Sequence, residues 1–232
     1  MRIDKLLTNV GAASRSEAAK AAARGEIKVN GKTVRRSDVH VDPESDEIVF
    51  KGERVVYKEF VYIMLNKPDG YVSATDDPRE KTVLELLPQK YNKLGLFPCG
   101  RLDKNTLGLI ILTNDGTGAH RVLSPKNHVE KTYRFECESK LEDKDVEMLA
   151  NGITLEDGYV TRDALIKVSD GRKSGEITIT EGKYHQIKRM FCAVGNKITY
   201  LERISFGDIA LDTALERGQW RELTEQEEKL FK

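Results

Sequence analysis

Apolar positions near the start of the chain recur at helical spacing. In residues 3–10 they fall at i, i+3, i+4 and i+7, which predicts a helix that Gly11 ends. Ser14 and Glu17 then form a capping box, in which each side chain can bind a free backbone amide of the other residue. An Ala-rich run follows and ends at Gly25, so the sequence predicts a second helix over residues 14–24.

The pattern changes to alternation directly after this second helix. Apolar and charged residues alternate up to Asn30-Gly31, which is the strongest short signal of a β-hairpin. Residues 51–60 are mostly polar and charged, with at most a short strand at residues 55–57, and are typical of a linker. We therefore expect a small N-terminal domain over residues 1–58, made of two helices and a hairpin.

From residue 60 onward most of the apolar runs are short, and several alternate with charged residues. Such runs, bounded by Gly, Pro, Asn and Asp, predict strands separated by a few helices. This combination favours an α+β fold around a mostly antiparallel sheet, filling a second domain over residues 59–232. The predicted strands cover residues 60–65, 107–113, 132–138, 176–180 and 201–209, the predicted helices cover 83–87, 184–194 and the C-terminal LTEQEEKLF, and Asp115-Gly116 is predicted to be a plain turn.

Charge changes this picture only near the N-terminus. The chain has 38 basic and 38 acidic residues, so no global excess indicates a polyanionic partner. Residues 1–36, however, hold nine Lys or Arg against three acids, and residues 37–59 reverse the balance with seven acids against three bases. A basic N-terminal lobe is as consistent with RNA binding as with an ordinary solvated surface.

Several classes of protein lack their usual signals. The three cysteines are widely spaced, which is typical of reduced, cytosolic thiols, and the four histidines show no metal-binding spacing. No apolar window reaches membrane-spanning length, and no signal peptide is evident. The nucleophile elbow, the Walker phosphate loop and the dinucleotide-binding glycine motif are also absent, so the chain is expected to be a soluble, cytoplasmic, metal-free protein.

The strongest candidate for chemistry is an acid at the entrance to a buried strand. Asp103 stands in a polar cluster just before the apolar run of residues 107–113. A carboxylate placed there must be neutral, paired or functional. On the helix predicted for residues 184–194, Lys188 flanks the apolar stripe and can reach Asp103, whereas Arg189 is expected to point toward solvent. From the residues alone, a structural salt bridge is favoured over a catalytic pair.

The N-terminal stretch RIDKLLTNVGAASRSEAAKAAARGEIKVNGKTV strongly resembles the S4 RNA-binding domain. The resemblance covers about fifty residues and includes the R-x-D-K-x-L start, the S-R-x-E-A helix entry and the V-N-G turn. Such domains hold structured RNA through shape and phosphate contacts on a basic helix face. The predicted phosphate contacts here are Arg15, Lys20, Arg24, Lys28 and Lys32.

Four further segments resemble the motifs of the pseudouridine synthases, in the expected order. NKPDGY at 66–71 is similar to the first motif and GRLDKNTLGL at 100–109 to the signature with the catalytic Asp, with Leu107 where many relatives have Ser or Gly. KTY at 131–133 is similar to the motif with the active-site Tyr, and EGKYHQIKRM at 181–190 to the third motif. The S4 region and the H-Q-x-K-R-M form resemble the RsuA branch, whose type member modifies 16S rRNA.

This resemblance implies a cofactor-free isomerisation with Asp103, Tyr133 and Lys188 as catalytic residues. Asp103 would either attack the ribose C1′ or assist removal of the 2′ proton. Tyr133 would lie against the uracil and serve in proton transfer, and Lys188 would orient Asp103. Arg101 would help to hold the target base out of its helix. His185 is assigned a packing or hydrogen-bonding role, and Lys67 and Arg189 are expected to contact RNA.

The implied partner is ribosomal RNA, most consistently the small-subunit 16S rRNA or an assembly intermediate, bound by a monomer with no membrane partner. Two alternatives stay open. The same reaction could act on large-subunit rRNA or tRNA, because substrate choice depends on loops and RNA shape. A non-catalytic S4 protein of ribosome assembly is less favoured, because binding alone does not require Asp103, Tyr133 and Lys188 together.

Overall fold

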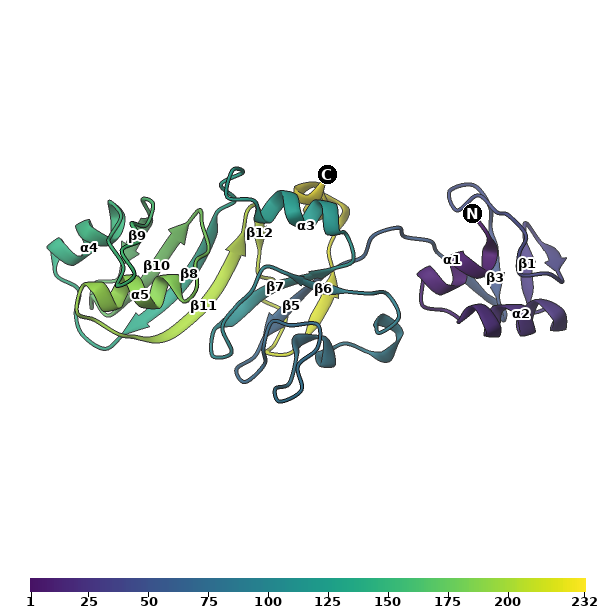
Figure 1. Cartoon of the computed structure of the whole chain (residues 1–232), viewed down its shortest axis with the longest axis horizontal. Helices are drawn as coiled ribbons and strands as arrows, with labels where there is room; N and C mark the ends of the chain where they lie inside the picture. Colours follow the sequence, from purple (N-terminus) through teal and green to yellow (C-terminus); the bar gives the residue numbers. More distant parts are fainter. The chain divides into compact units, whose positions relative to one another are not determined.

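The computed structural model describes all residues, 1–232, and divides them into two compact units. Residues 1–61 and 87–96 form the first unit, and residues 62–86 and 97–232 form the second. In Figure 1 the first unit carries α1, α2, β1 and β3, and the second carries the elements from β5 to the C-terminus. None of the helices is long and apolar enough to cross a membrane.

The first unit packs two helices on a small antiparallel sheet, as the sequence predicts. Ser14 and Glu17 form the expected capping box, and Gly25 ends the second helix in the left-handed conformation. Asn30 and Gly31 both have positive φ, as the predicted hairpin turn requires. The helices are α1 (Ile3–Asn9) and α2 (Arg15–Arg24), and the sheet, in the order β2-β1-β3-β4, contains β1 (Ile27–Val29), β2 (Lys32–Val34), β3 (Ile48–Phe50) and β4 (Glu53–Val55).

The predicted linker at residues 51–60 is wrong in its first half. Lys51 and Gly52 both adopt positive φ and turn the chain back, so that β4 pairs with β3. The short strand therefore lies at Glu53–Val55 rather than at residues 55–57. The sequence did not reveal this second hairpin, because Lys at the first turn position is not a usual hairpin signal.

The second unit is built around a nine-stranded sheet, and the predicted α+β, mostly antiparallel fold is confirmed. Its main path runs β13-β5-β7-β11-β8-β10-β9, with β12 on β11 and β6 on β7, and only the pairing of β7 with β11 is parallel. The strands are β5 (Tyr62–Lys67), β6 (Phe97–Cys99), β7 (Leu107–Thr113), β8 (Lys131–Cys137), β9 (Leu165–Val168), β10 (Ser174–Ile179), β11 (Ile198–Phe206), β12 (Ile209–Ala210) and β13 (Trp220–Glu222).

Short helices accompany this sheet. Figure 1 shows α4 and α5 beside the part formed by β8, β9 and β10, and α3 near the C-terminal end of the chain. The helices of the unit are α3 (Gly116–Leu123), α4 (Asp143–Ala150), α5 (Gln186–Ala193) and α6 (Glu225–Glu228), with 3₁₀ turns η1 (Val83–Leu86) and η3 (Lys229–Phe231); η2 (Gln89–Tyr91) groups with the first unit.

The prediction that Asp115-Gly116 is a plain turn is wrong. Asp115 is the N-cap of α3 and accepts a hydrogen bond from the amide of Gly118 at 2.9 Å. Its other oxygen accepts from the hydroxyl of Tyr62 at 2.7 Å, and the side chain is buried. Asp is favoured both in turns and at helix N-caps, so the dipeptide alone does not distinguish them.

Gly108 allows the single parallel pairing of the sheet. Its φ is +94°, and it pairs with Lys67 of β5 on one side and with Arg203 of β11 on the other. A Cβ at this position would lie 2.3 Å from the carbonyl oxygen of Arg203. The close approach of β11 to β7 therefore requires glycine here.

We predict that Gly108→Ala lowers the free energy of unfolding by about 3 kcal/mol or more, because it adds a backbone clash to an unfavourable φ. Gly158→Ala is the matched control, since Gly158 has a φ of +82° and open space around the Cβ position. The control should lose only about 1 kcal/mol. Urea unfolding of both variants measures the difference, and equal losses would show that the strand approach does not require glycine.

Candidate active site

An open cleft lies in the second unit around Asp103. Its walls come from the loop 101–106, from the strands β8, β10 and β11, and from the segment 182–188, which leads into and includes the start of α5. Leu102, Ile179 and Leu201 supply an apolar part of the lining, and charged and polar side chains supply much of the rest. The cleft therefore combines apolar surface with a small number of polar groups, as ligand sites usually do.

Asp103 is paired, not isolated. Its Oδ2 accepts a hydrogen bond from the ammonium of Lys188 at 2.6 Å, so the pairing expected from helical geometry is present. The same ammonium donates to Oδ1 of Asn105 at 2.6 Å. Both Asp103 and Lys188 are about one-quarter exposed, so the carboxylate is paired and still accessible from the cleft.

The buried side chain of Lys67 anchors the loop that carries Asp103. Its ammonium donates to the carbonyl oxygens of Lys104 and Thr106, both at 2.9 Å, and to that of Pro68 at 3.1 Å. The side chain is completely buried, and this burial lowers the pKa of Lys67 to about 8. All three N–H donors are used on backbone carbonyls, so the end of β5 and the loop 103–106 are tied together.

Two further contacts fix the same loop. The hydroxyl of Ser73 donates to the carbonyl of Leu102 at 2.9 Å and accepts from the amide of Leu102 at 3.0 Å. The amide of Gly70 donates to the carbonyl of Lys104 at 3.1 Å. The NKPDGY segment and the residues just after it thus position Asp103 without touching its carboxylate.

Tyr133 and His185 complete the surroundings of the carboxylate. Tyr133 is buried on β8 and lines the cleft, as the inward side of the predicted strand requires. His185 lies with Nε2 3.4 Å from Oδ1 of Asp103, so both carboxylate oxygens face a nitrogen. The hydrogen-bonding assignment of His185 fits this position, but its proximity to Asp103 had no signal in the sequence.

The structure contradicts one predicted RNA contact and one predicted side-chain direction. Lys67 is buried and its three donors are occupied, so it is not available to RNA. Arg189 does not point toward solvent: its side chain is only 16% exposed and pairs with Asp157 at 2.6 Å and Glu156 at 3.5 Å. The helical wheel placed Arg189 opposite the core, but the loop before residue 160 covers that side of α5.

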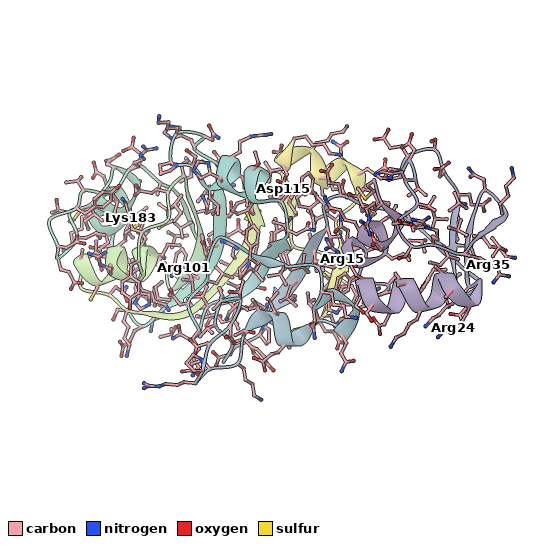
Figure 2. The ribbon with its side chains drawn as sticks, turned by 45° about the vertical axis from the view of Figure 1, so that its right-hand side comes forward. Arg15, Arg24, Arg35, Arg101, Asp115 and Lys183 are labelled. Atoms are coloured by element: carbon pink, nitrogen blue, oxygen red, sulfur yellow. The ribbon has the colours of Figure 1, made fainter.

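The other candidate cations are exposed. Arg101 lies at the cleft, and Figure 2 shows it with Lys183 beside α5. Figure 2 also shows Arg15 and Arg24 projecting from α2, where Arg24 forms an ion pair with Glu26 at 2.6 Å. Four of the predicted contacts in the first unit are exposed without an ion pair or side-chain hydrogen bond, namely Arg15, Lys20, Lys28 and Lys32.

The chain belongs to the RNA pseudouridylate synthase family. The model of that family matches residues 61–193, which is more than half of the chain, and the model of the S4 domain matches residues 1–48. The cleft with its Asp–Lys pair lies within the first match, apart from Leu201 in its lining. The chain is thus an enzyme of the isomerase class with an N-terminal S4 domain.

Individual relatives match over nearly the whole length. The chain is 48% identical to the uncharacterized RNA pseudouridine synthase YtzG of Bacillus subtilis, over 98% of this chain and 96% of that protein. It is 41% identical to ribosomal small subunit pseudouridine synthase A of Haemophilus influenzae over the full length of both, and 39% identical to that of Escherichia coli K12 over 98% of both. A solved pseudouridylate synthase, 39% identical, covers 100% of this chain with a TM-score of 0.70.

The buried ammonium of Lys67 predicts a measurable pH dependence of stability. The pKa of Lys67 is about 8 in the folded protein and near its ordinary 10.5 in the unfolded chain, so the unfolded state binds more protons between these values. This group therefore adds stability as the pH rises from 8 to 10.5, by up to about 3 kcal/mol. Lys67→Met should lack this gain and should also lower kcat, because the loop loses its anchor.

Urea unfolding of the wild type and Lys67→Met at pH 7.5 and pH 10 measures the effect. Lys131, whose pKa burial also lowers to about 8, contributes to both proteins and cancels in the difference. Lys197→Met removes an exposed lysine of the same unit and should keep the wild-type pH dependence. The same pH dependence in Lys67→Met and the wild type would contradict the assignment.

Proposed function

We propose that the protein converts a specific uridine of small-subunit 16S rRNA to pseudouridine, with Asp103 as the essential carboxylate and no cofactor. The observation that carries this proposal is the 2.6 Å pair of Asp103 and Lys188 inside a cleft that Tyr133 and Arg101 also line. A purely structural ion pair would not need a carboxylate left one-quarter exposed in a cleft.

The proposed reaction rearranges bonds within one nucleotide. The bond between the ribose C1′ and the uracil N1 breaks, the base turns, and a new bond joins C1′ to C5. The proton on C5 leaves, and N1 gains one, so atoms and electrons balance without an outside reagent. Attack of Asp103 on C1′ and removal of the 2′ proton both use the carboxylate, which the ammonium of Lys188 holds in place at 2.6 Å.

The cleft offers a place for each part of the nucleotide. Tyr133, with Leu201 and Ile179 nearby in the lining, offers an aromatic ring to the uracil, and its hydroxyl can carry a proton during the exchange. Arg101 is exposed at the cleft and can hold the phosphate of a nucleotide that has left its helix. We assign Tyr133 and Lys188 catalytic roles beside Asp103.

The first unit supplies the proposed docking surface for structured RNA. Arg15 and Lys20 of α2 and Lys28 and Lys32 of the hairpin are exposed cations without an acidic partner. Unpaired, exposed cations can contact phosphates without first breaking an ion pair. The 16S rRNA assignment rests on the relatives of H. influenzae and E. coli, which match this chain through both units.

The test is a map of pseudouridines across all rRNAs and tRNAs in cells with and without the protein. Loss of one site in 16S rRNA is expected, and wild-type protein should restore it. Asp103→Asn should restore nothing, while its affinity for 16S rRNA stays within about two-fold of wild type, because the exchange removes a charge but keeps the shape.

Other results of this experiment would contradict specific parts of the proposal. A site lost from large-subunit rRNA or tRNA would overturn the substrate, and an unchanged map would favour the non-catalytic S4 protein. Restoration of the site by Asp103→Asn would overturn the role of the carboxylate.

Neutralising the exposed cations of the first unit should weaken RNA binding and its salt dependence. Replacing Arg15, Lys20, Lys28 and Lys32 together by Gln should reduce the slope of log affinity against log salt by about 3, since each phosphate contact contributes about 0.7 to 0.9. Filter binding of 16S rRNA between 50 and 300 mM salt gives this slope. The matched control replaces four exposed lysines of the second unit, Lys140, Lys144, Lys167 and Lys197, and an equal effect of both changes would refute a specific docking surface.

A further inference from the structure

Tyr184 is an exposed aromatic side chain at the edge of the active-site cleft. Its side chain is 74% exposed, more than any other large apolar or aromatic side chain of the chain. The ring stacks on that of His185, with centroids 3.8 Å apart and planes inclined by 18°. One face of Tyr184 is therefore covered by a parallel ring, and its other face is free.

This stacked pair is joined directly to the catalytic group. The face of the His185 ring contacts Tyr184, and its Nε2 lies 3.4 Å from Asp103. His185 lines the cleft, whereas Tyr184 does not. A base on the free face of Tyr184 would consequently lie outside the cleft, next to the nucleotide that occupies it.

The backbone that presents the pair is held rigidly. His185 has a φ of 49° and a ψ of 32°, a left-handed conformation that costs a residue other than glycine about 1 kcal/mol. Gln186 fixes the turn from both sides: its Oε1 accepts from the amide of Lys183 at 2.9 Å, and its Nε2 donates to buried Glu181 at 2.6 Å. Strain kept in place by buried hydrogen bonds is typical of functional positions.

Glu181 anchors this turn to the rest of the unit. Its carboxylate accepts from the hydroxyl of Tyr159 at 2.6 Å and from the amide of Arg162 at 3.1 Å. Behind the turn, the guanidinium of Arg189 donates to the carbonyl of Tyr184 at 3.4 Å and pairs with Asp157. Tyr184 is thus exposed at its ring but fixed at its backbone.

Two exposed cations belong to the same region as the pair. Lys183 precedes Tyr184 directly, is exposed and lines the cleft, and Arg101 lies in the same lining. Proteins bind unpaired nucleic acid with this combination, in which cations follow the phosphates and aromatic rings stack on the bases. A nucleic-acid strand offers both partners at once, because its phosphates are anionic and its bases have flat aromatic faces.

We propose that Tyr184 is the stacking platform for the base next to the target uridine, with His185 as its inner layer. The platform sets the register of the strand, so that one particular uridine lies over Asp103. Tyr184 is then a specificity-determining residue that binds RNA without taking part in bond breaking. This inference rests on the proposed function, because it assumes that the cleft holds a uridine of an RNA strand.

Three variants test the inference on a 16S rRNA transcript that carries tritium at C5 of uridine, which is released when C5 joins C1′. Tyr184→Ala should lower kcat/KM by about five- to one hundred-fold, mainly through KM, because stacking of one base is lost. Tyr184→Phe keeps the ring and should stay within about two-fold of wild type. Leu165→Ala, which shortens a side chain that is 68% exposed on β9, should also match wild type.

A binding measurement separates this inference from the proposed function. The measurement uses Asp103→Asn protein, which is not expected to convert the RNA, and a transcript with 2-aminopurine beside the target uridine. Its fluorescence should be quenched when position 184 is Tyr, or Phe in the Tyr184→Phe variant. It should not be quenched by the Tyr184→Ala variant. If this quenching occurs while wild-type protein releases no tritium, the proposed reaction fails and the platform stands. Three results would overturn the platform. The first is that Tyr184→Ala quenches 2-aminopurine as strongly as the protein with Tyr184. The others are that Tyr184→Phe loses as much kcat/KM as Tyr184→Ala, or that Leu165→Ala does.

Discussion

The ammonium of Lys67 is the contact on which the active site depends most. It lies in the interior, where a cation is unfavourable, and is stabilised there because three backbone carbonyls accept hydrogen bonds from it. Two of these carbonyls belong to the loop that carries Asp103. A neutral apolar side chain of similar size would leave them without donors, so the position of the Asp103 carboxylate is maintained by a buried ammonium.

The sheet adds a second constraint, which acts through Gly108. This residue pairs with Lys67 on one side and Arg203 on the other, so it lies just behind the loop of Asp103 and joins β5, β7 and β11. β11 also supplies Leu201 to the cleft, and its neighbour β8 supplies Tyr133. Close backbone approach at one glycine thereby brings the walls of the cleft to the correct distance from the carboxylate.

The sequence predicted the local elements that depend on local chemistry. The capping box at Ser14, the hairpin at Asn30-Gly31 and the alternating strand around Tyr133 are all present, because each is determined by neighbouring residues. The pairing of Lys188 with Asp103 also followed from helical geometry. The α3 helix was missed, because Asp115 caps it through a buried contact with Tyr62 that no local pattern reveals.

The individual roles of the cations could not be predicted from the sequence. Lys67 follows a strand and precedes Pro-Asp-Gly, so it was expected on an exposed turn, but the loop 103–106 folds over it. Arg189 was expected in solvent, but Asp157 comes from a distant segment to pair with it. In each case the deciding partner is far away in the chain, and hydrophobic periodicity carries no information about such partners.

The distribution of ion pairs also explains how a chain of zero formal charge can present a basic surface. In the first unit, three arginines each pair with an acid two residues later, as Arg2 does with Asp4, Arg24 with Glu26 and Arg36 with Asp38. These short-range pairs neutralise part of the local charge and leave other cations of α2 and the hairpin unpaired. A polyanion binds these unpaired cations most readily, because a paired cation must first break its ion pair. The formal net charge alone therefore does not reveal the unpaired cations of this unit.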